Sequence, residues 1–193
     1  SWSRDPDMSD ELFNRNLNVL RRHPAAFNAV AFAVRQYRSD SYLVEVAKNG
    51  DLTMSYVEES QKTISYHSRY NPAAEAEKLV AAGYEGQTHA MLLGFGLGYM
   101  AENLLGRFGP RVGGPQLFVI EPDAGIFLTA MKNRDLTGFL ADARVALCVG
   151  LTADQVGDFW GTNLDWTVME RLAIVDHPPS AARFKQYFAR VVE

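Results

Sequence analysis

The second half of the chain alternates between short apolar runs and segments with the composition of helices. Strands are expected over residues 90–93, 116–120, 144–149 and 171–175. Helices are expected over residues 73–82, 99–107, 122–131, 152–160 and 181–192. Strands that alternate with helices form parallel sheets, because each helix returns the chain to the same edge. We therefore predict an α/β, Rossmann-like fold, with a mostly parallel sheet and helices on both faces.

The first seventy residues have a different organisation. Apolar side chains at helical spacing predict two helices, over residues 10–23 and 25–35, with Pro24 between them. Two β-rich runs follow, and the Asn49-Gly50 dipeptide between them is typical of a two-residue hairpin turn. A third short run completes an expected antiparallel β-meander over residues 42–47, 52–57 and 63–67.

This change of pattern gives a domain boundary. Asn71 can cap a helix, and Pro72 suits the first helical position because its missing N–H costs nothing there. We predict a helical and β-hairpin N-terminal subdomain at residues 1–70 and a Rossmann-like α/β domain at residues 71–193.

Three alternating glycines stand where the first strand of the predicted sheet meets its helix. Glycine lets the backbone turn tightly and approach a ligand, and a helix N-terminus offers free N–H groups. The next strand ends in acids, whose carboxylates can accept hydrogen bonds from ribose hydroxyls. The predicted ligand-binding residues are Gly94, Phe95, Gly96, Leu97, Gly98, Glu121 and Asp123. The alternative is a tight strand-to-helix turn that binds nothing.

The spacing of the glycines separates this loop from the dinucleotide fingerprint. That fingerprint is G-x-G-x-x-G, whereas this chain has G-x-G-x-G followed by Tyr99. The spacing resembles the first motif of S-adenosylmethionine-dependent methyltransferases, which usually have an acid where this chain has Leu92 and Leu93. That resemblance makes S-adenosylmethionine a candidate cofactor and a small-molecule methyltransferase-like enzyme an alternative function.

A second polar cluster joins the meander to the first helix of the α/β part. It consists of His67, Ser68, Arg69 and Tyr70. Side chains of these types in a connection can bind an anion or position a substrate. The alternative is a polar turn between the two parts of the chain.

Composition excludes several other functions. The formal net charge of −4 argues against general nucleic-acid binding. Cys148, the single cysteine, cannot form a disulfide scaffold and is expected to be buried in a strand. The four histidines lack metal-ligand spacing with it or with each other, so we predict no metal site. We find no membrane-spanning stretch, secretory signal or convincing catalytic base or nucleophile, so we expect a cytoplasmic protein and name no catalytic residue.

Three segments together resemble a bacterial protein family. They are Tyr-His-Ser-Arg-Tyr-Asn-Pro-x-x-Glu-Ala-Glu at 66–77, Leu-Gly-Phe-Gly-Leu-Gly-Tyr at 93–99 and Val-Ile-Glu-Pro-Asp at 119–123. As a set they are similar to the N-terminal region of the motility accessory factor (Maf) proteins. The resemblance extends over roughly residues 11–175.

The Maf resemblance implies a role in glycosylating flagellin with nonulosonic sugars such as pseudaminic or legionaminic acid. In the longer proteins a transfer domain follows, which resembles sialyltransferases and 6-hydroxymethylpterin diphosphokinase-like proteins. This chain begins without Met and ends within an amphipathic pattern, so we expect a fragment that lacks this C-terminal catalytic domain. The implied ligands and partners are a cytidine nucleotide, a nucleotide sugar or flagellin. A non-catalytic interaction module is a third interpretation.

Overall fold

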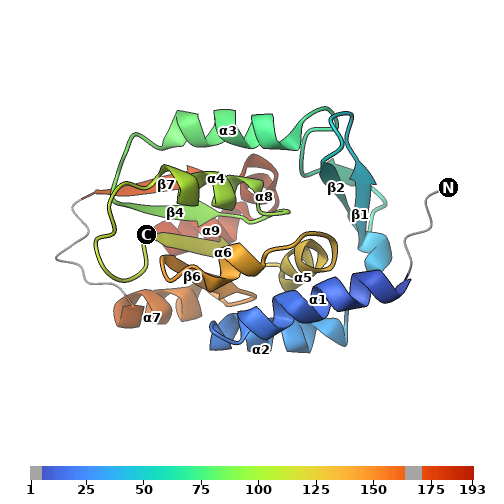
Figure 1. Cartoon of the computed structure of the whole chain (residues 1–193), viewed down its shortest axis with the longest axis horizontal. Helices are drawn as coiled ribbons and strands as arrows, with labels where there is room; N and C mark the ends of the chain where they lie inside the picture. Colours follow the sequence, from blue (N-terminus) through green and yellow to red (C-terminus); the bar gives the residue numbers. More distant parts are fainter. Residues whose placement is uncertain (1–5, 164–170) are drawn as a thin grey trace.

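Four parallel strands form the central sheet of the chain. A computed structural model describes residues 6–163 and 171–193 (Figure 1). The strands are β4 (His89–Leu93), β5 (Leu117–Glu121), β6 (Val145–Val149) and β7 (Leu172–Asp176), in the order β6-β5-β4-β7. All three neighbouring pairs are parallel, which confirms the predicted α/β class. The chain first builds β4, β5 and β6 in one direction and then places β7 on the other side of β4.

Helices cover both faces of this sheet. They are α3 (Pro72–Gly83), α4 (Tyr99–Arg107), α5 (Ala124–Asn133), α6 (Thr137–Ala141), α7 (Ala153–Asn163), α8 (Pro178–Arg183) and α9 (Lys185–Val192). Alternate strand residues point to opposite faces, so Leu92 joins the core beneath α3, α4 and α5. Its neighbour Met91 instead packs in the core with Trp160 of α7 and Phe188 of α9. Cys148 lies in this second core and is buried, as expected.

A three-stranded antiparallel sheet precedes the parallel one. Its strands are β1 (Tyr42–Val46), β2 (Leu52–Val57) and β3 (Thr63–Ser65), in the order β1-β2-β3. The predicted turn joins β1 to β2, with Gly50 at a φ of 93°. A short 3₁₀ helix, η1 (Ser39–Ser41), leads into β1. Figure 1 shows β1 and β2 at one end of the molecule, beside the start of α3.

Two N-terminal helices pack on α5, along the flank opposite α3 (Figure 1). They are α1 (Pro6–Leu20) and α2 (Pro24–Val34). The fully buried Asn16 amide donates to the carbonyls of Met131 and Arg134, at 2.8 and 2.7 Å. Leu20 and Val30 belong to the same core as the parallel sheet. The predicted boundary at residue 70 stays a prediction, and residues 1–5 and 164–170 lie outside the description.

Several helices differ from those expected. The helix predicted over 10–23 forms at Pro6–Leu20, and α6 was not predicted. The segment predicted as one helix over 181–192 forms α8 and α9, with Phe184 between them at a non-helical ψ of 36°. The helix predicted from residue 122 begins at Ala124 instead. Asp123 is its N-cap, because its carboxylate accepts a hydrogen bond from the Gly125 amide at 2.8 Å.

Among the described residues, no helix is long and apolar enough to span a membrane. The described part of the chain also contains no group of three or more His, Cys, Asp or Glu side chains that could hold a metal ion.

Candidate functional site

The glycine loop, residues 94–98, is buried between β4 and α4. Its amides donate to acceptors within the protein. Gly94 donates to the carbonyl of Ile120 and Phe95 to the Glu121 carboxylate, at 2.8 and 3.0 Å. The Leu97 amide donates to Nε2 of His67 at 2.9 Å. These contacts occupy N–H groups that a ligand would need.

All three glycines of the loop are closely packed, and a Cβ at Gly98 would lie 2.8 Å from Cζ of Phe95. A Cβ at Gly94 would collide with the Cβ of Ser180, and one at Gly96 would lie 2.6 Å from Nε2 of His67. Gly94 and Gly96 also have positive φ angles of 98° and 56°. The glycines therefore let His67 and the start of α8 approach the loop.

A pair of buried histidines closes the crevice above the loop. His177 follows β7, and its ring lies 5.2 Å from that of His67. Its Nε2 donates to the carbonyl of Tyr66 at 2.9 Å, so its Nδ1 accepts from the hydroxyl of Ser180 at 2.7 Å. Burial lowers the pKa of His177 to about 4. Burial, and then the proximity of His177, lowers the pKa of His67 well below its usual value.

The position of this histidine pair matters, because ligands of open α/β sheets bind where the strand order reverses. Here the reversal lies between β4 and β7. The loops that follow these two strands contain Gly94 and His177, and both are buried against each other. The described side chains therefore fill the crevice that usually receives a ligand.

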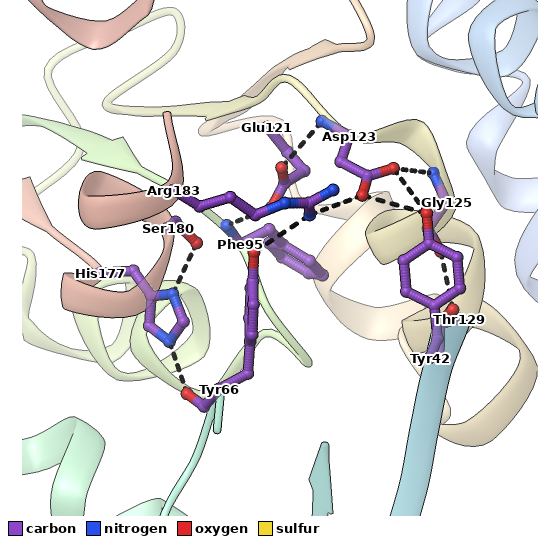
Figure 2. Close-up of polar contacts among 10 residues, drawn as sticks. All are labelled: Tyr42, Tyr66, Phe95, Glu121, Asp123, Gly125, Thr129, His177, Ser180 and Arg183. Atoms are coloured by element: carbon purple, nitrogen blue, oxygen red, sulfur yellow. Dashed lines mark hydrogen bonds and ion pairs between the residues drawn. The ribbon is translucent and has the colours of Figure 1, made fainter. Parts of the chain in front are cut away.

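Glu121 connects the glycine loop to the start of α5. Its carboxylate is fully buried and accepts from the amides of Phe95 and Asp123, each at 3.0 Å (Figure 2). Burial, followed by the nearby Asp123 carboxylate, raises the pKa of Glu121 to about 7. The Glu121 carboxylate therefore joins the glycine loop to the turn before α5. The role of Glu121 and the loop in ligand binding stays a prediction.

The polar cluster at residues 67–70 does not converge on one place. His67 points inward to the glycine loop. The Ser68 hydroxyl accepts from the amides of Tyr70 and Asn71 at 3.1 and 3.2 Å, within the turn before α3. Arg69 and Tyr70 are exposed, and the Tyr70 ring lies under the ammonium of Lys48. The four residues thus divide between a buried contact and a surface turn.

An open cavity of about 670 Å³ lies beside this closed crevice. Its floor is the backbone after β5 and β6, from Pro122 to Gly125 and at Gly150. We call it the tyrosine–arginine pocket, after the side chains that line it: Tyr37, Tyr42, Tyr56, Arg38 and Arg183. Its volume is within the range of small-molecule sites. Of the predicted ligand-binding residues, Asp123 alone is among the described residues that line it.

Asp123 and Arg183 form the polar centre of this pocket (Figure 2). The Asp123 carboxylate accepts from the hydroxyl of Tyr42 at 2.9 Å and from Nη1 of Arg183 at 2.7 Å. Nη1 of Arg183 also donates to the hydroxyl of Tyr66 at 3.2 Å. Burial, and then the Asp123 charge, raises the pKa of Tyr42, so its hydroxyl remains a donor.

Apart from Asp123, the pocket residues carry no sequence signal of a site. Tyr42, Tyr56 and Arg183 come from β1, β2 and α8, and only the tertiary fold brings them together. His177 has one signal, since it directly follows a strand of a parallel sheet, where functional side chains gather.

Comparisons with known proteins address the fold. No family model matches the chain. An uncharacterized protein of Treponema pallidum (strain Nichols) is 29% identical over 162 residues, which are 81% of this chain and 47% of that protein. The structure of a Maf glycosyltransferase from Magnetospirillum magneticum AMB-1 superposes with a TM-score of 0.57 at 16% identity. That match covers 95% of this chain and 35% of the glycosyltransferase.

The chain therefore spans about half the length of the Treponema relative and about a third of the glycosyltransferase. The resemblance to Maf proteins that three sequence segments indicate is confirmed at the level of the fold.

Proposed function

We propose that this chain is the N-terminal domain of a Maf-type protein that acts in flagellin glycosylation with nonulosonic sugars. The observation that carries the proposal is the fold shared with a Maf glycosyltransferase over 95% of the chain. The three Maf-like segments also meet in space, which supports the proposal. His67 of the first contacts Leu97 of the second, and Phe95 of the second contacts Glu121 of the third.

The role of this domain is to bind a nucleotide or the acceptor rather than to catalyse transfer by itself. Two observations support this division. Glu121, His67 and His177 are buried and hydrogen-bonded to protein groups, so they are poorly placed to touch a substrate. The tyrosine–arginine pocket is open and large enough for a small ligand. Catalysis then belongs to a domain that follows this one in a longer, cytoplasmic protein.

A methyltransferase-like enzyme that uses S-adenosylmethionine is the alternative from the sequence. No contact among the described residues favours it, because protein groups occupy amides of the glycine loop. The third interpretation is a non-catalytic interaction module that binds no small ligand. It differs from the proposal because nothing would bind in the tyrosine–arginine pocket.

The test is the mass of flagellin in the bacterium that encodes this protein. Deletion of the gene for the full-length product is expected to lower the mass of intact flagellin by that of its nonulosonic sugars. Complementation with the wild-type gene is expected to restore it, and mass spectrometry measures both. An unchanged flagellin mass after deletion would overturn the proposal.

A further inference from the structure

Arg183 is held in one orientation at the edge of the tyrosine–arginine pocket. Its Nη1 donates to both Asp123 and Tyr66 (Figure 2). Its guanidinium carbon also lies 3.4 Å from the centre of the Tyr56 ring, in a cation–π contact. Only 15% of the side chain is exposed. A guanidinium fixed in this way loses little conformational freedom when it binds a ligand.

The other side of the same guanidinium has donors to offer. Among the described residues, Nε and Nη2 of Arg183 have no hydrogen-bond partner, and the residue lines the pocket. Figure 2 shows both contacts on one terminal nitrogen and none on the other. Two adjacent N–H donors in the plane of a guanidinium match the two oxygens of a carboxylate or a phosphate.

The charges around the pocket limit how much negative charge it can accept. Asp123 is already paired with Arg183, and Arg38 is the second cation of the lining. Three further acids of the lining are Asp40, Glu58 and Glu59. A second phosphate on a ligand would meet these carboxylates, and like charges at short range repel. The lining thus has more acids than basic residues, so an anion is favoured only where it meets the Nε and Nη2 donors of Arg183, and a diphosphate is disfavoured.

The remaining lining suits a ring with hydroxyl groups. Tyr37 and Tyr42 are stacked, with ring centres 5.4 Å apart and planes within 2°. Aromatic surfaces of this kind pack against the flat face of a ligand ring. Gln36 and Gln61 line the same cavity, and their amides both donate and accept, as hydroxyl groups require.

The geometry points to a binding site in the tyrosine–arginine pocket for a small molecule that carries one oxyanion on a hydroxylated ring. Arg183 binds the oxyanion, which is a carboxylate or a phosphate monoester, and the tyrosines pack against the ring. This inference rests on the proposed function, which assigns ligand binding to this domain, and it adds the place and the chemical class. The site lies outside the glycine loop that the sequence singles out.

Titration with simple probes tests the chemical class. Glucuronate carries the carboxylate, ribose 5-phosphate carries the phosphate, and glucose is the neutral control. Calorimetry or NMR is expected to give a dissociation constant of about 1 mM for one of the two anions, which identifies the oxyanion, and no binding of glucose. Equal binding of glucose, or no binding of either anion at about 20 mM, would overturn the inference.

Substitutions test the place. Arg183→Lys keeps the charge but loses the planar pair of donors, so we expect about tenfold weaker binding. Arg190→Lys is the matched control, because Arg190 pairs with Asp154 at the same 2.7 Å but does not line the pocket. Because substitution of Arg183 also changes its ion pair with Asp123, a second variant leaves both residues in place. Ala33→Phe fills the cavity from α2 and is expected to abolish binding.

Wild-type affinity in both Arg183→Lys and Ala33→Phe, with folding verified by thermal unfolding, would overturn the inference. This outcome is distinct from a failure of the proposed function, because the flagellin mass does not depend on these probes. If deletion of the gene removes the flagellin glycan but neither anion binds the protein, the proposed function stands and the proposed site is wrong. If an anion binds the protein but deletion of the gene leaves the flagellin mass unchanged, the proposed site stands and the proposed function is wrong.

Discussion

The glycine loop and the tyrosine–arginine pocket lie at the same edge of the parallel sheet and differ in what fills them. Residues 94–98 are buried, and amides such as those of Phe95 and Leu97 donate to side chains of the protein. The pocket after β5 and β6 is open, and Arg183 has donors without a described partner there. The same edge of the sheet therefore has a turn whose amides bond to the protein itself and a hollow in which donors of Arg183 have no partner among the described residues.

The physical cause of the difference lies in residues outside the loop. His67 comes from the segment after β3, and His177 and Ser180 come from the segment after β7. These side chains occupy the crevice at the reversal of strand order, where a ligand usually binds. Helix α2 and the meander then build a hollow beside it, over the ends of β5 and β6.

The largest expected effect is on the closed loop. Gly94→Ala adds a Cβ that collides with the Cβ of Ser180, an atom whose position the backbone of α8 fixes. Gly94 also has a φ of 98°, which L residues rarely adopt. Positive φ costs an L residue about 1–2 kcal/mol, and overpacking adds about 1–3 kcal/mol. We therefore expect a loss of about 2–5 kcal/mol in the free energy of unfolding, measured by urea denaturation.

Gly113→Ala is the matched control for this substitution. Gly113 has a similar φ of 82°, but a Cβ there would have open space around it. Its variant is expected to lose only the backbone contribution, about 1–2 kcal/mol. Equal losses in the two variants would show that the loop is not closely packed and would weaken the contrast with the pocket.

Acid titration gives the next largest effect, because the crevice contains buried groups with shifted pKa values. For His67 and His177 the folded pKa lies below the usual 6.5, so the unfolded state binds more protons and stability falls as the pH falls from 6.5 towards about 4. For Glu121 the folded pKa of about 7 exceeds the usual 4.5, so stability rises as the pH falls through that range.

Within the crevice, two histidines oppose one carboxyl group, which leaves a net effect of about one proton. Outside it, burial also lowers the pKa of His23 and His89, and these two histidines act in the same direction. The free energy of unfolding is then expected to fall by at least about 2 kcal/mol between pH 6.5 and pH 5. Glu121→Gln removes the opposing group and is expected to make the fall steeper, as urea denaturation over a pH series can measure. A shallower fall in Glu121→Gln would contradict the assignment of these groups as buried.

Local sequence signals predicted most of the fold. Asn71 and Pro72 predicted the start of α3, where the Asn71 side chain accepts from the Ala74 amide at 3.0 Å. The range predicted for α4, residues 99–107, is the range observed. These elements follow from capping and from apolar runs, which depend on residues close in the sequence. The break between α8 and α9 has no such local signal.

The candidate site was less predictable, because its contacts join residues far apart in the sequence. The partners Tyr66 and His177 are separated by 111 residues, and Asp123 and Arg183 by 60. The glycine pattern predicted a tight turn, but the close approach that it predicted was to a ligand and not to a group of the protein. The groups that approach are the side chains of His67 and Ser180. Whether a ligand also uses the loop stays a prediction.

The smallest expected effect concerns the wall of the open pocket. Tyr42→Phe removes a hydroxyl that donates to Asp123, while Arg183 and the Gly125 amide continue to donate to that carboxylate. The expected loss in the free energy of unfolding is about 1 kcal/mol, the usual net value of one hydrogen bond. Tyr70→Phe, at a residue 65% exposed, is the control and is expected to change little. A loss in Tyr42→Phe as large as that in Gly94→Ala would mean that the pocket wall is as tightly constrained as the loop.

The most direct test of the contrast is a map of backbone amide chemical shifts during titration with glucuronate, ribose 5-phosphate, S-adenosylmethionine and cytidine monophosphate. The account predicts shifts at Tyr42, Tyr56, Gly125 and Gly150 with an oxyanion probe, because these residues line the tyrosine–arginine pocket. It predicts no shifts at Gly94, Gly96 and Gly98 with any of the four. Shifts centred on those glycines, with the pocket residues unchanged, would contradict it.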